Sequence, residues 1–321
     1  ILVTTGLSPS AHIASSIDDS SPGWWESIVG KDKPIDASQY FIICVNSLGS
    51  CFGSSGPSSK DPKSGKKYRL SFPEISIEDI ASSIKPVIDG LGIERLKAIV
   101  GPSMGGMTAL SLIKQFPGIT DDLVLISAAS SSRPFSIALR SLQRSMITSD
   151  PQWEEGNYNQ DDLPLEGMKH ARFLGMITYR SPTEWNKRFG RKLIQNIAER
   201  ADLFGNRFLI QDYLKRRSDD FISDFDPNSY LYLSNAIDAF DFAEDCDDIE
   251  ETVENLDLNR VLIIGVEEDY IFPFQCQEDL YNAFSTQKYS VDLLKLPSIN
   301  GHDSFLVDNE NFGNALAKFF K

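Results

Sequence analysis

The segment Gly101-Pro102-Ser103-Met104-Gly105 constrains the fold of this 321-residue chain more than any other feature. It directly follows the apolar run Ala98-Ile99-Val100 and leads into 104–116, a stretch with helical periodicity. A Gly-x-Ser-x-Gly sequence in this context indicates a sharp, strained strand-to-helix turn that exposes the serine as a nucleophile. The flanking glycines are needed because such a turn leaves no room for a Cβ atom. The alternative interpretation is a glycine-rich turn with no chemical role.

Short β-branched runs alternate with longer amphipathic stretches over the first 130 residues. This alternation is typical of parallel strands joined by crossover helices. The expected strands are 1–5, 40–46, 97–101, 123–128, 261–266 and 290–296, and the expected helices are 77–91, 104–116 and 311–320. Together with the Gly-x-Ser-x-Gly turn, the pattern predicts an α/β-hydrolase fold with a mostly parallel sheet.

Residues 132–241 have a different sequence pattern from the first 130 residues. Runs of β-branched residues are absent, and polar sequence with helical character is interrupted by proline and glycine. We interpret this segment as a helical lid inserted above the carboxyl edge of the sheet, where α/β sheets bind their ligands. The α/β-hydrolase core is then formed by residues 1–131 and 242–321. The acidic stretch 244–254 is expected to be a solvated linker or helix face that returns to the sheet.

A formal net charge of −15 argues against nucleic acid as a partner, because affinity for phosphate backbones comes from lysine and arginine. No apolar run is long enough to cross a bilayer, and no leader sequence is recognisable. We therefore expect a soluble intracellular protein, cytoplasmic or mitochondrial, whose partners are small molecules. The four cysteines match neither a disulfide framework nor a metal site, so free thiols and no metal ion are expected.

The serine hydroxyl needs a base within hydrogen-bond reach, normally a histidine. Of the three histidines, His170 lies in the helical insertion and His12 lies just after the first strand. His302 occupies the loop after the last strand, which is where this fold places its base. The sequence therefore predicts that His302 activates Ser103.

The acid that orients this histidine should follow the penultimate strand. Three carboxylates compete there, namely Glu267, Glu268 and Asp269. Spacing does not separate them, and two of the three are expected to be surface charges. We favour Asp269, because it falls deepest into the loop.

Two backbone amides are expected to stabilise the oxyanion that forms on acyl transfer. One belongs to Met104, at the start of the helix after the nucleophile. The other comes from the turn after the first strand, at Leu7. Both contributions come from the main chain, so no side-chain motif can reveal them.

Longer motifs in the same order resemble the homoserine O-acetyltransferase family. The matching segments are Ser103-Met104-Gly105-Gly106-Met107, 40–46, 53–59, 225–230 and Gly301-His302-Asp303-Ser304-Phe305. The resemblance covers nearly the whole chain, and it implies an acyl-CoA-dependent O-acyltransferase that works through Ser103, His302 and Asp269 in a tunnel beneath the lid. It also implies acetyl-CoA as co-substrate, no permanently bound cofactor, and a homodimer.

In this family an arginine and a tyrosine of the lid, and the aspartate after the catalytic histidine, hold the amino-acid acceptor. The matching positions here are Arg172, Tyr179 and Asp303. The chemistry agrees, because a guanidinium clamps a carboxylate and a carboxylate meets an ammonium group. Arg172 and Tyr179 are two helical turns apart and therefore share one helix face.

The chain departs from the family pattern after its first strand. Members usually carry His-Ala-Leu-Thr there, whereas this chain reads Thr5-Gly6-Leu7-Ser8, and the segment, including Ser8, is expected to line the acceptor pocket. Together with 23–26 and 179–185, it looks closer to the fungal branch that acylates L-serine. Members also have strands ahead of the point where this chain begins, so these strands are expected to be missing.

The sequence thus predicts transfer of acetyl from acetyl-CoA to L-serine, with L-homoserine as the next acceptor, in cysteine or methionine biosynthesis. The alternatives are a succinyl-CoA donor, an esterase that uses the same triad with water, and a non-catalytic binding module on this fold. The CoA phosphates would require a local cluster of positive charge. The candidates are Lys187, Arg188, Arg191 and Lys192, although such a run is also typical of a solvated helix face.

Overall fold

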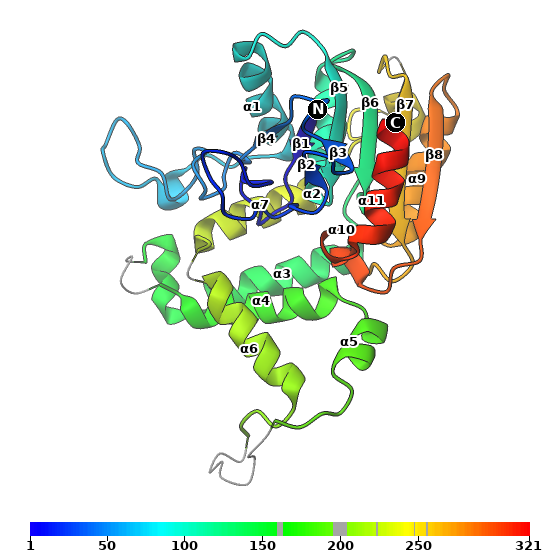
Figure 1. The fold of residues 1–321 in the computed structure, drawn as a ribbon. Coiled ribbons are helices and arrows are strands. Elements are labelled where there is room, and N and C mark those ends of the chain that lie inside the picture. The colour runs from blue at the N-terminus through cyan, green and yellow to red at the C-terminus, as the bar shows by residue number, and fades with distance from the viewer. Residues whose placement is uncertain (159–162, 195–203, 223, 247, 255) are drawn as a thin grey trace.

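Six strands form one parallel sheet at the centre of the molecule (Figure 1). The computed structural model describes residues 1–321 except 159–162, 195–203, 223, 247 and 255. Every neighbouring pair of strands in the sheet is parallel. In their order across the sheet the strands are β4 (Ile43–Val45), β1 (Leu2–Thr4), β5 (Leu96–Pro102), β6 (Thr120–Ile126), β7 (Arg260–Val266) and β8 (Ser290–Leu296).

The strand order reverses at β1. The next strand of the sheet along the chain, β4, lies on one side of β1, whereas β5 and all later strands lie on the other. At such a reversal the connections leave the sheet in opposite directions and open a crevice beyond the carboxyl ends of the strands. The loops that follow β1 and β5 both reach this crevice, so the topology places a ligand site between them.

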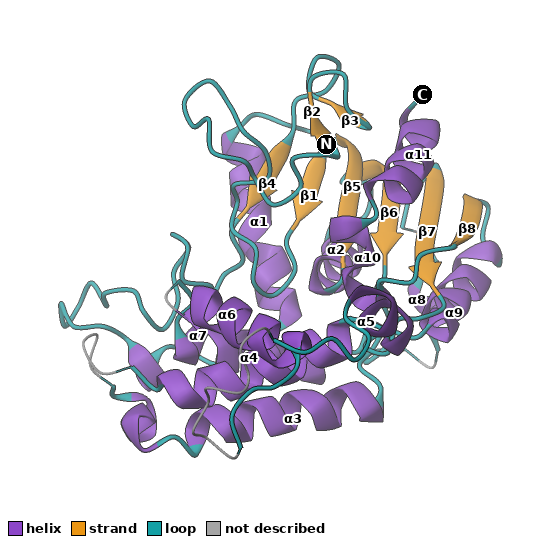
Figure 2. Cartoon of the chain, turned by 60° about the horizontal axis from the view of Figure 1, so that its bottom comes forward, coloured by secondary structure: helices purple, strands orange, loops and turns teal. Residues whose placement is uncertain are grey.

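Alternate side chains of the central strands pack into two separate apolar clusters. On β6, Leu123 and Leu125 belong to one cluster, and Val124 and Ile126 belong to the other. This is the expected alternation of a strand that is buried on both faces. The first cluster is covered by α1 (Ile77–Gly90), α2 (Met104–Gln115) and α9 (Phe274–Ser285), and the second by α11 (Asn309–Phe320) (Figure 2).

Between β6 and β7 the chain leaves the sheet and forms a helical layer across the carboxyl ends of the strands (Figure 2). An antiparallel bridge between Ser131 and Asp241 closes the base of this excursion. We call residues 132–241 the lid, and the division of the chain into core and lid stays a prediction. The lid elements are α3 (Pro134–Thr148), η2 (Pro151–Gly156), α4 (Leu165–Tyr179), α5 (Pro182–Arg188), α6 (Leu209–Ile222) and α7 (Pro227–Ala239).

Some element boundaries differ from those expected. The strand expected at 123–128 begins at Thr120 and ends at Ile126, because Ser127 has a φ of 45° and cannot continue an extended strand. The expected strands at 1–5 and 40–46 are shorter than predicted. Elements that sequence reasoning missed or left undefined are β2 (Val29–Gly30), β3 (Ile35–Asp36), η1 (Arg69–Ser71), α8 (Ile249–Thr252), α9, η4 (Gly301–Asp303) and α10 (Ser304–Val307).

Within the described part of the chain, no helix combines the length and the apolar character that a membrane span requires.

We expect Phe312→Ala to lower the free energy of unfolding by about 3–5 kcal/mol, because it deletes a fully buried ring between α11 and the sheet and leaves a cavity. Chemical denaturation measures this change. The exposed Lys318 on the same helix supplies the control, and Lys318→Ala should stay within about 0.5 kcal/mol of the parent. Equal losses in the two variants would contradict the packing of α11 on the sheet.

Candidate active site

Ser103 occupies the turn between β5 and α2 in a backbone conformation that L-residues rarely adopt. Its φ is 57° and its ψ is −126°. Strain of this kind costs about 1–3 kcal/mol and persists only where the surroundings enforce it. Here the N–H of Ser103 donates to the carbonyl of Ile126 at 2.9 Å, and its own carbonyl accepts from Gly106 at 2.9 Å. These bonds tie the turn to β6 and to α2, so the serine side chain stands at the carboxyl edge of the sheet.

The two glycines that flank the serine are required by close packing. A Cβ atom at Gly101 would lie 2.5 Å from the carbonyl oxygen of Gly105. A Cβ atom at Gly105 would lie 2.4 Å from the carbonyl oxygen of Thr4 on β1. The first turn of α2 therefore rests directly on backbone atoms of β5 and β1.

Ser103, His302 and Asp269 form one hydrogen-bonded chain. His302 Nδ1 is 2.8 Å from Asp269 Oδ2, and His302 Nε2 is 2.8 Å from Ser103 Oγ. Because a carboxylate can only accept, Nδ1 carries the proton, and Nε2 is left to accept the serine proton. The other oxygen of Asp269 accepts the amides of Ile271 and Phe272, each at 2.9 Å. The geometry matches a nucleophile, base and orienting acid, and these roles stay a prediction.

The two competing carboxylates of the same loop point elsewhere. Glu267 is exposed and pairs with Lys295, and Glu268 accepts a hydrogen bond from Thr183. The other two histidines are also outside the triad, since His170 lies exposed on α4. Only the tertiary structure distinguishes these exposed or differently paired side chains from the buried pair of Asp269 and His302.

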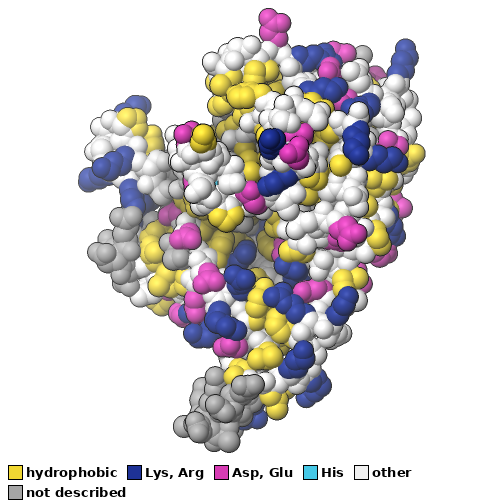
Figure 3. All heavy atoms as spheres, viewed as in Figure 1, with side chains coloured by type: hydrophobic (Ala, Val, Ile, Leu, Met, Phe, Trp, Pro, Cys, Tyr) yellow, Lys and Arg dark blue, Asp and Glu magenta, His cyan; other side chains and the backbone are white. Residues whose placement is uncertain are grey.

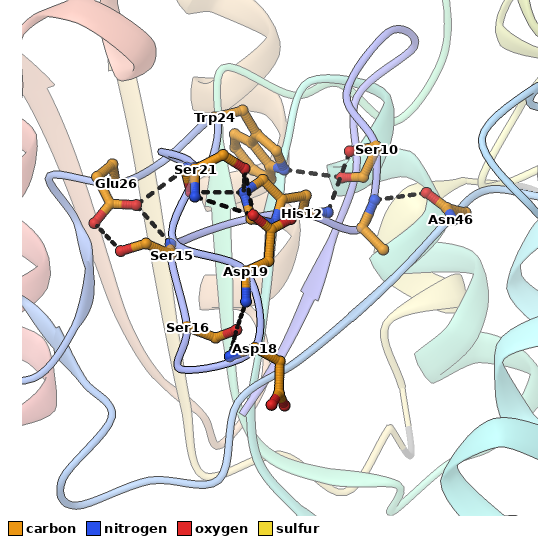
Figure 4. A network of polar contacts seen from close by, with 12 residues as sticks. Ser10, His12, Ser15, Ser16, Asp18, Asp19, Ser21, Trp24, Glu26 and Asn46 are labelled. Atoms are coloured by element: carbon orange, nitrogen blue, oxygen red, sulfur yellow. Dashed lines mark hydrogen bonds and ion pairs between the residues drawn. The ribbon is translucent and has the colours of Figure 1, made fainter.

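His12 belongs to a polar network in the loop after β1 (Figure 4). Its Nε2 lies 2.9 Å from the carbonyl oxygen of Ser21 and 3.1 Å from the Ser21 hydroxyl, and its Nδ1 lies 3.6 Å from Asp19. The indole of Trp24 donates to the carbonyl of Ser10 at 3.0 Å in the same loop. Since Trp24 lines the cavity at Ser103, this network fixes one wall of the site.

Two opposing effects act on the pKa of His302. Burial is the larger single contribution and lowers it, because the charged imidazole is removed from water. The charge of Asp269 and its hydrogen bond favour the charged form, and with a smaller contribution from Asp303 they outweigh burial. The pKa of His302 is therefore raised above its ordinary value.

A cavity of about 80 Å³ lies between Ser103 and the lid. The turn after β1 forms part of its wall, with Leu7 and Ser8 among the lining residues. Met104 follows Ser103 as the first residue of α2, where the helical amides have no partner within the helix. The structure thus brings both backbone segments close to Ser103, and the oxyanion role of Leu7 and Met104 stays a prediction.

The three positions expected to hold an amino-acid acceptor all line this cavity. Arg172 has a buried Nε with no hydrogen-bond partner among the described residues, and its guanidinium lies 4.3 Å from the ring of Phe221. Tyr179 is half-buried, and its removal from water raises its pKa. The carboxylate of Asp303 accepts from Arg180 Nε at 2.9 Å. A guanidinium with an unused donor in a cavity suits an anion.

Three further lid residues line the cavity and were missed by sequence reasoning, namely Arg140, Tyr230 and Ile237. Arg180, which holds Asp303, was missed as well. Tyr230 lies within segment 225–230, which contributed to the family resemblance, but the sequence analysis gave this residue no role. Arg140 had no local signal, because nothing in the periodicity of α3 shows which face meets the cavity.

A second cavity of about 350 Å³, which we call the vestibule, shares Arg172 and Asp303 with the first. Arg180 and Arg217 also line it, together with the rings of Trp185, Tyr213 and Phe221. Lys and Arg side chains gather on the face over the lid helices (Figure 3).

The four cations expected to meet CoA phosphates are all exposed, and none of them lines the vestibule. Arg188 stacks on Tyr213 at 4.4 Å and pairs with Glu184 at 3.4 Å, and Arg191 stacks on Phe208 at 5.3 Å. Their role toward CoA stays a prediction.

No group of three or more His, Cys, Asp or Glu side chains is arranged to hold a metal ion in the described ranges. The four cysteines are free in the structure. The expectation that the protein needs no metal stays a prediction.

Comparison with known proteins places the chain in a family. Residues 12–306 match the family model for the alpha/beta hydrolase fold. The chain is 45% identical over 320 residues to the serine O-succinyltransferase of Litchfieldella anticariensis, covering 99% of this chain and 87% of the relative. It is 47% identical over 324 residues to the L-serine/homoserine O-acetyltransferase of Streptomyces lavendulae, covering 99% and 86%.

Solved structures agree with this fold. The homoserine O-acetyltransferase of Bacillus anthracis superposes with a TM-score of 0.88 at 24% identity, covering 100% of this chain and 88% of the other. An esterase superposes equally well, with a TM-score of 0.88 at 25% identity and coverage of 100% and 89%. The fold alone therefore does not separate acyl transfer from ester hydrolysis.

The chain is an enzyme of the α/β-hydrolase superfamily, and the predicted fold class is confirmed. Within that superfamily it belongs to the family of serine and homoserine O-acyltransferases, which confirms the resemblance found in the sequence.

We expect the reaction of Ser103 with an aryl phosphonate to require neutral His302, so the rate should fall as pH drops through an apparent pKa above 6.5. Asp269→Asn removes the charge that raises this pKa, so the midpoint should move to lower pH and the rate should drop about 10³–10⁴-fold. The pH dependence of inactivation measures both effects. Glu268→Gln, in the same loop, should leave the midpoint in place, and an unmoved midpoint in Asp269→Asn would contradict the assignment.

Proposed function

We propose that the enzyme transfers an acyl group from acyl-CoA to the side-chain hydroxyl of L-serine, with L-homoserine as a second acceptor. The observation that carries this proposal is the guanidinium of Arg172, whose buried Nε has no hydrogen-bond partner among the described residues, in the same cavity as Ser103. Water as acceptor needs no such group, whereas an amino acid brings a carboxylate that matches it. Serine stands in the names of both relatives described above.

In the first half-reaction Ser103 Oγ attacks the thioester carbonyl of acyl-CoA, while His302 Nε2 takes the hydroxyl proton. The new Oγ–C bond forms a tetrahedral intermediate, whose oxyanion accepts from the amides of Leu7 and Met104. The C–S bond then breaks, and the CoA sulfur leaves with the proton from His302. Asp269 stabilises the imidazolium that exists between these two proton transfers.

In the second half-reaction the acceptor hydroxyl replaces the CoA thiol. His302 takes its proton, the hydroxyl oxygen attacks the acyl carbon, and the bond to Ser103 Oγ breaks as that oxygen regains a proton. The chemistry requires the acceptor hydroxyl to approach more readily than water. Closure of the cavity by the lid favours this outcome, since Tyr179 and Phe272 pack against the ring of His302 and shield it from bulk water.

The acceptor is oriented by groups of opposite charge. Arg172 binds its carboxylate and Tyr179 hydrogen-bonds to it, while Asp303 meets its ammonium group. The bond from Arg180 holds one oxygen of Asp303 and thereby aims the carboxylate. Ser8 also lines the cavity, and we expect it to lie beside the acceptor side chain.

The vestibule is the proposed route for CoA. Residues 165–217 carry 12 Lys and Arg against 5 Asp and Glu, although the chain as a whole has a net charge of −15. This part of the sequence is thus rich in positive charge, and Arg172, Arg180 and Arg217 line the vestibule beside Asp220 and Asp303. We expect the three arginines to attract an anionic co-substrate and to speed its encounter with the enzyme. Acetyl-CoA and succinyl-CoA carry the same anionic CoA group, so the positive charge of the vestibule does not discriminate between the two donors.

We further propose that the product, an O-acylated serine or homoserine, serves cysteine or methionine biosynthesis. A homodimer and an intracellular location stay predictions. The relatives named above come from bacteria, which have no mitochondria, so they lend no support to the mitochondrial alternative.

Incubation with acyl-CoA alone should leave one acyl group on the peptide that contains Ser103, and added L-serine should discharge it as O-acylserine. Mass spectrometry of intact protein and peptides measures both steps. Ser103→Ala should show neither, while Ser127→Ala, which changes another turn serine at the end of β6, should keep the acyl group. If water discharges the acyl-enzyme as fast as L-serine does, the enzyme is an esterase and the proposal is wrong.

Arg172→Met should raise the KM for L-serine about 100-fold, because the acceptor carboxylate loses its charge-assisted partner. The sharper readout is the preference for L-serine over ethanolamine, which has the hydroxyl and ammonium groups but no carboxylate. This preference should disappear in Arg172→Met and persist in Arg216→Met, which removes an exposed arginine of α6. An unchanged preference in Arg172→Met would refute the role of this residue.

A further inference from the structure

We propose that Asn46 is a positioning residue for the reaction, because its side-chain amide holds the loop after β1 where the N–H of Leu7 can meet the oxyanion. The inference rests on the proposed function, in which that N–H donates to the tetrahedral intermediate. Asn46 is not one of the residues that line the cavity at Ser103. It therefore acts through the loop and does not touch the substrate.

The loop after β1 reaches the cavity through residues 6–9, all of which line it. This segment lies outside the helices and strands, and no backbone carbonyl of the described residues accepts from the amides of Gly6, Leu7 or Ser8. Amides without a backbone partner are free to donate to an oxyanion beside Ser103. The same freedom leaves the segment without internal support, so its position depends on contacts at its two ends.

The first end of the segment is fixed inside the core. Thr4 Oγ1 donates to the carbonyl of Gly105 at 2.7 Å, in the first turn of α2. The hydroxyls of Thr5 and Ser47 lie 2.9 Å apart, and both residues are buried. These hydrogen bonds tie the start of the segment to the helix that follows Ser103 and to the chain after β4.

The second end is held by Asn46, which directly follows β4 (Figure 4). Its Oδ1 accepts from the N–H of Ala11 at 2.5 Å, and its Nδ2 donates to the carbonyl of Phe52 at 2.6 Å. Because one partner is a donor and the other is an acceptor, only one orientation of the amide satisfies both. The side chain cannot turn without losing a hydrogen bond, so it fixes Ala11 in the loop that carries Leu7.

The contact from Asn46 joins the loop to a neighbouring strand of the sheet. The pairing of Thr4 with Val45 sets β4 beside β1, and Asn46 comes next along the chain. The indole of Trp24 also holds this part of the loop, since it donates to the carbonyl of Ser10 at 3.0 Å. Trp24, however, belongs to the same loop. Loss of the Asn46 amide would leave the loop bonded to itself and less firmly bonded to the sheet.

Two esters that differ in one atom test the inference. Acylation of Ser103 by 4-nitrophenyl acetate forms an oxyanion, whereas the thiono ester, with sulfur in place of the carbonyl oxygen, forms a larger anion that accepts hydrogen bonds poorly. Amides aimed at an oxyanion therefore favour the oxo ester. Release of 4-nitrophenol in a single turnover measures both rates. In Asn46→Ala the oxo rate should fall about 10–100-fold, because a misplaced amide binds the oxyanion less well.

The ratio of the oxo rate to the thiono rate separates positioning from a general defect. It should fall at least about fivefold in Asn46→Ala, because the lost stabilisation concerns the oxyanion. A merely structural defect would lower both rates together and leave the ratio unchanged. Ser54→Ala is the matched control, since it removes only the hydroxyl that donates to the main-chain carbonyl of Asn46. Its ratio should stay within about twofold of the parent.

Asn46→Asp keeps the size of the side chain and covers the case in which Asn46→Ala does not fold. Its carboxylate still accepts from Ala11 but repels the carbonyl of Phe52, so the ratio should lie between those of Asn46→Ala and the parent. A parental ratio in folded Asn46→Ala, or in Asn46→Asp where the alanine variant does not fold, overturns the inference and leaves the proposed function standing. A parent enzyme in which neither esters nor acyl-CoA acylate Ser103 would overturn the proposed function, and this inference with it.

Discussion

The first turn of α2 lies so close to β1 that no Cβ atom fits at Gly105, and this contact holds Ser103 in its strained conformation. Ser103 is thereby fixed at the carboxyl edge of the sheet, where the strand order reverses. His302 and Asp269 reach the same edge from the loops after β8 and β7. A parallel sheet thus delivers all three groups to one place, because all of its strands end at one side.

The lid is attached to the loop that carries His302 as well as covering it. Gly301 has a φ of 65° and packs so closely that a Cβ atom there would lie 2.6 Å from the carbonyl of Tyr179. Ser181 donates to the carbonyl of Ile299, and Arg180 donates to Asp303. The end of α4, which lines the cavity, and the loop of His302 are therefore one packed unit. A displacement of the lid would disturb the triad as well as the pocket.

Charge is distributed unevenly over this acidic protein. The mouth of the site is basic, and the buried cluster of Arg140, Arg144 and Asp238 adds positive charge to the cavity wall. A local positive field favours small anions at the lid. Both proposed substrates are anionic or carry a carboxylate, so electrostatics and chemistry point to the same opening.

The sequence by itself determined the turn at Ser103, the six strands and the choice of His302, because glycine spacing and hydrophobic periodicity are local signals. It left Asp269 in competition with two neighbouring glutamates until family resemblance was considered. Only the tertiary structure decided that Asp269 is buried against His302 and that Arg140 reaches the cavity. Those outcomes depend on packing between α3, α7 and the sheet edge, elements far apart along the chain, and such contacts leave no periodic trace in the sequence.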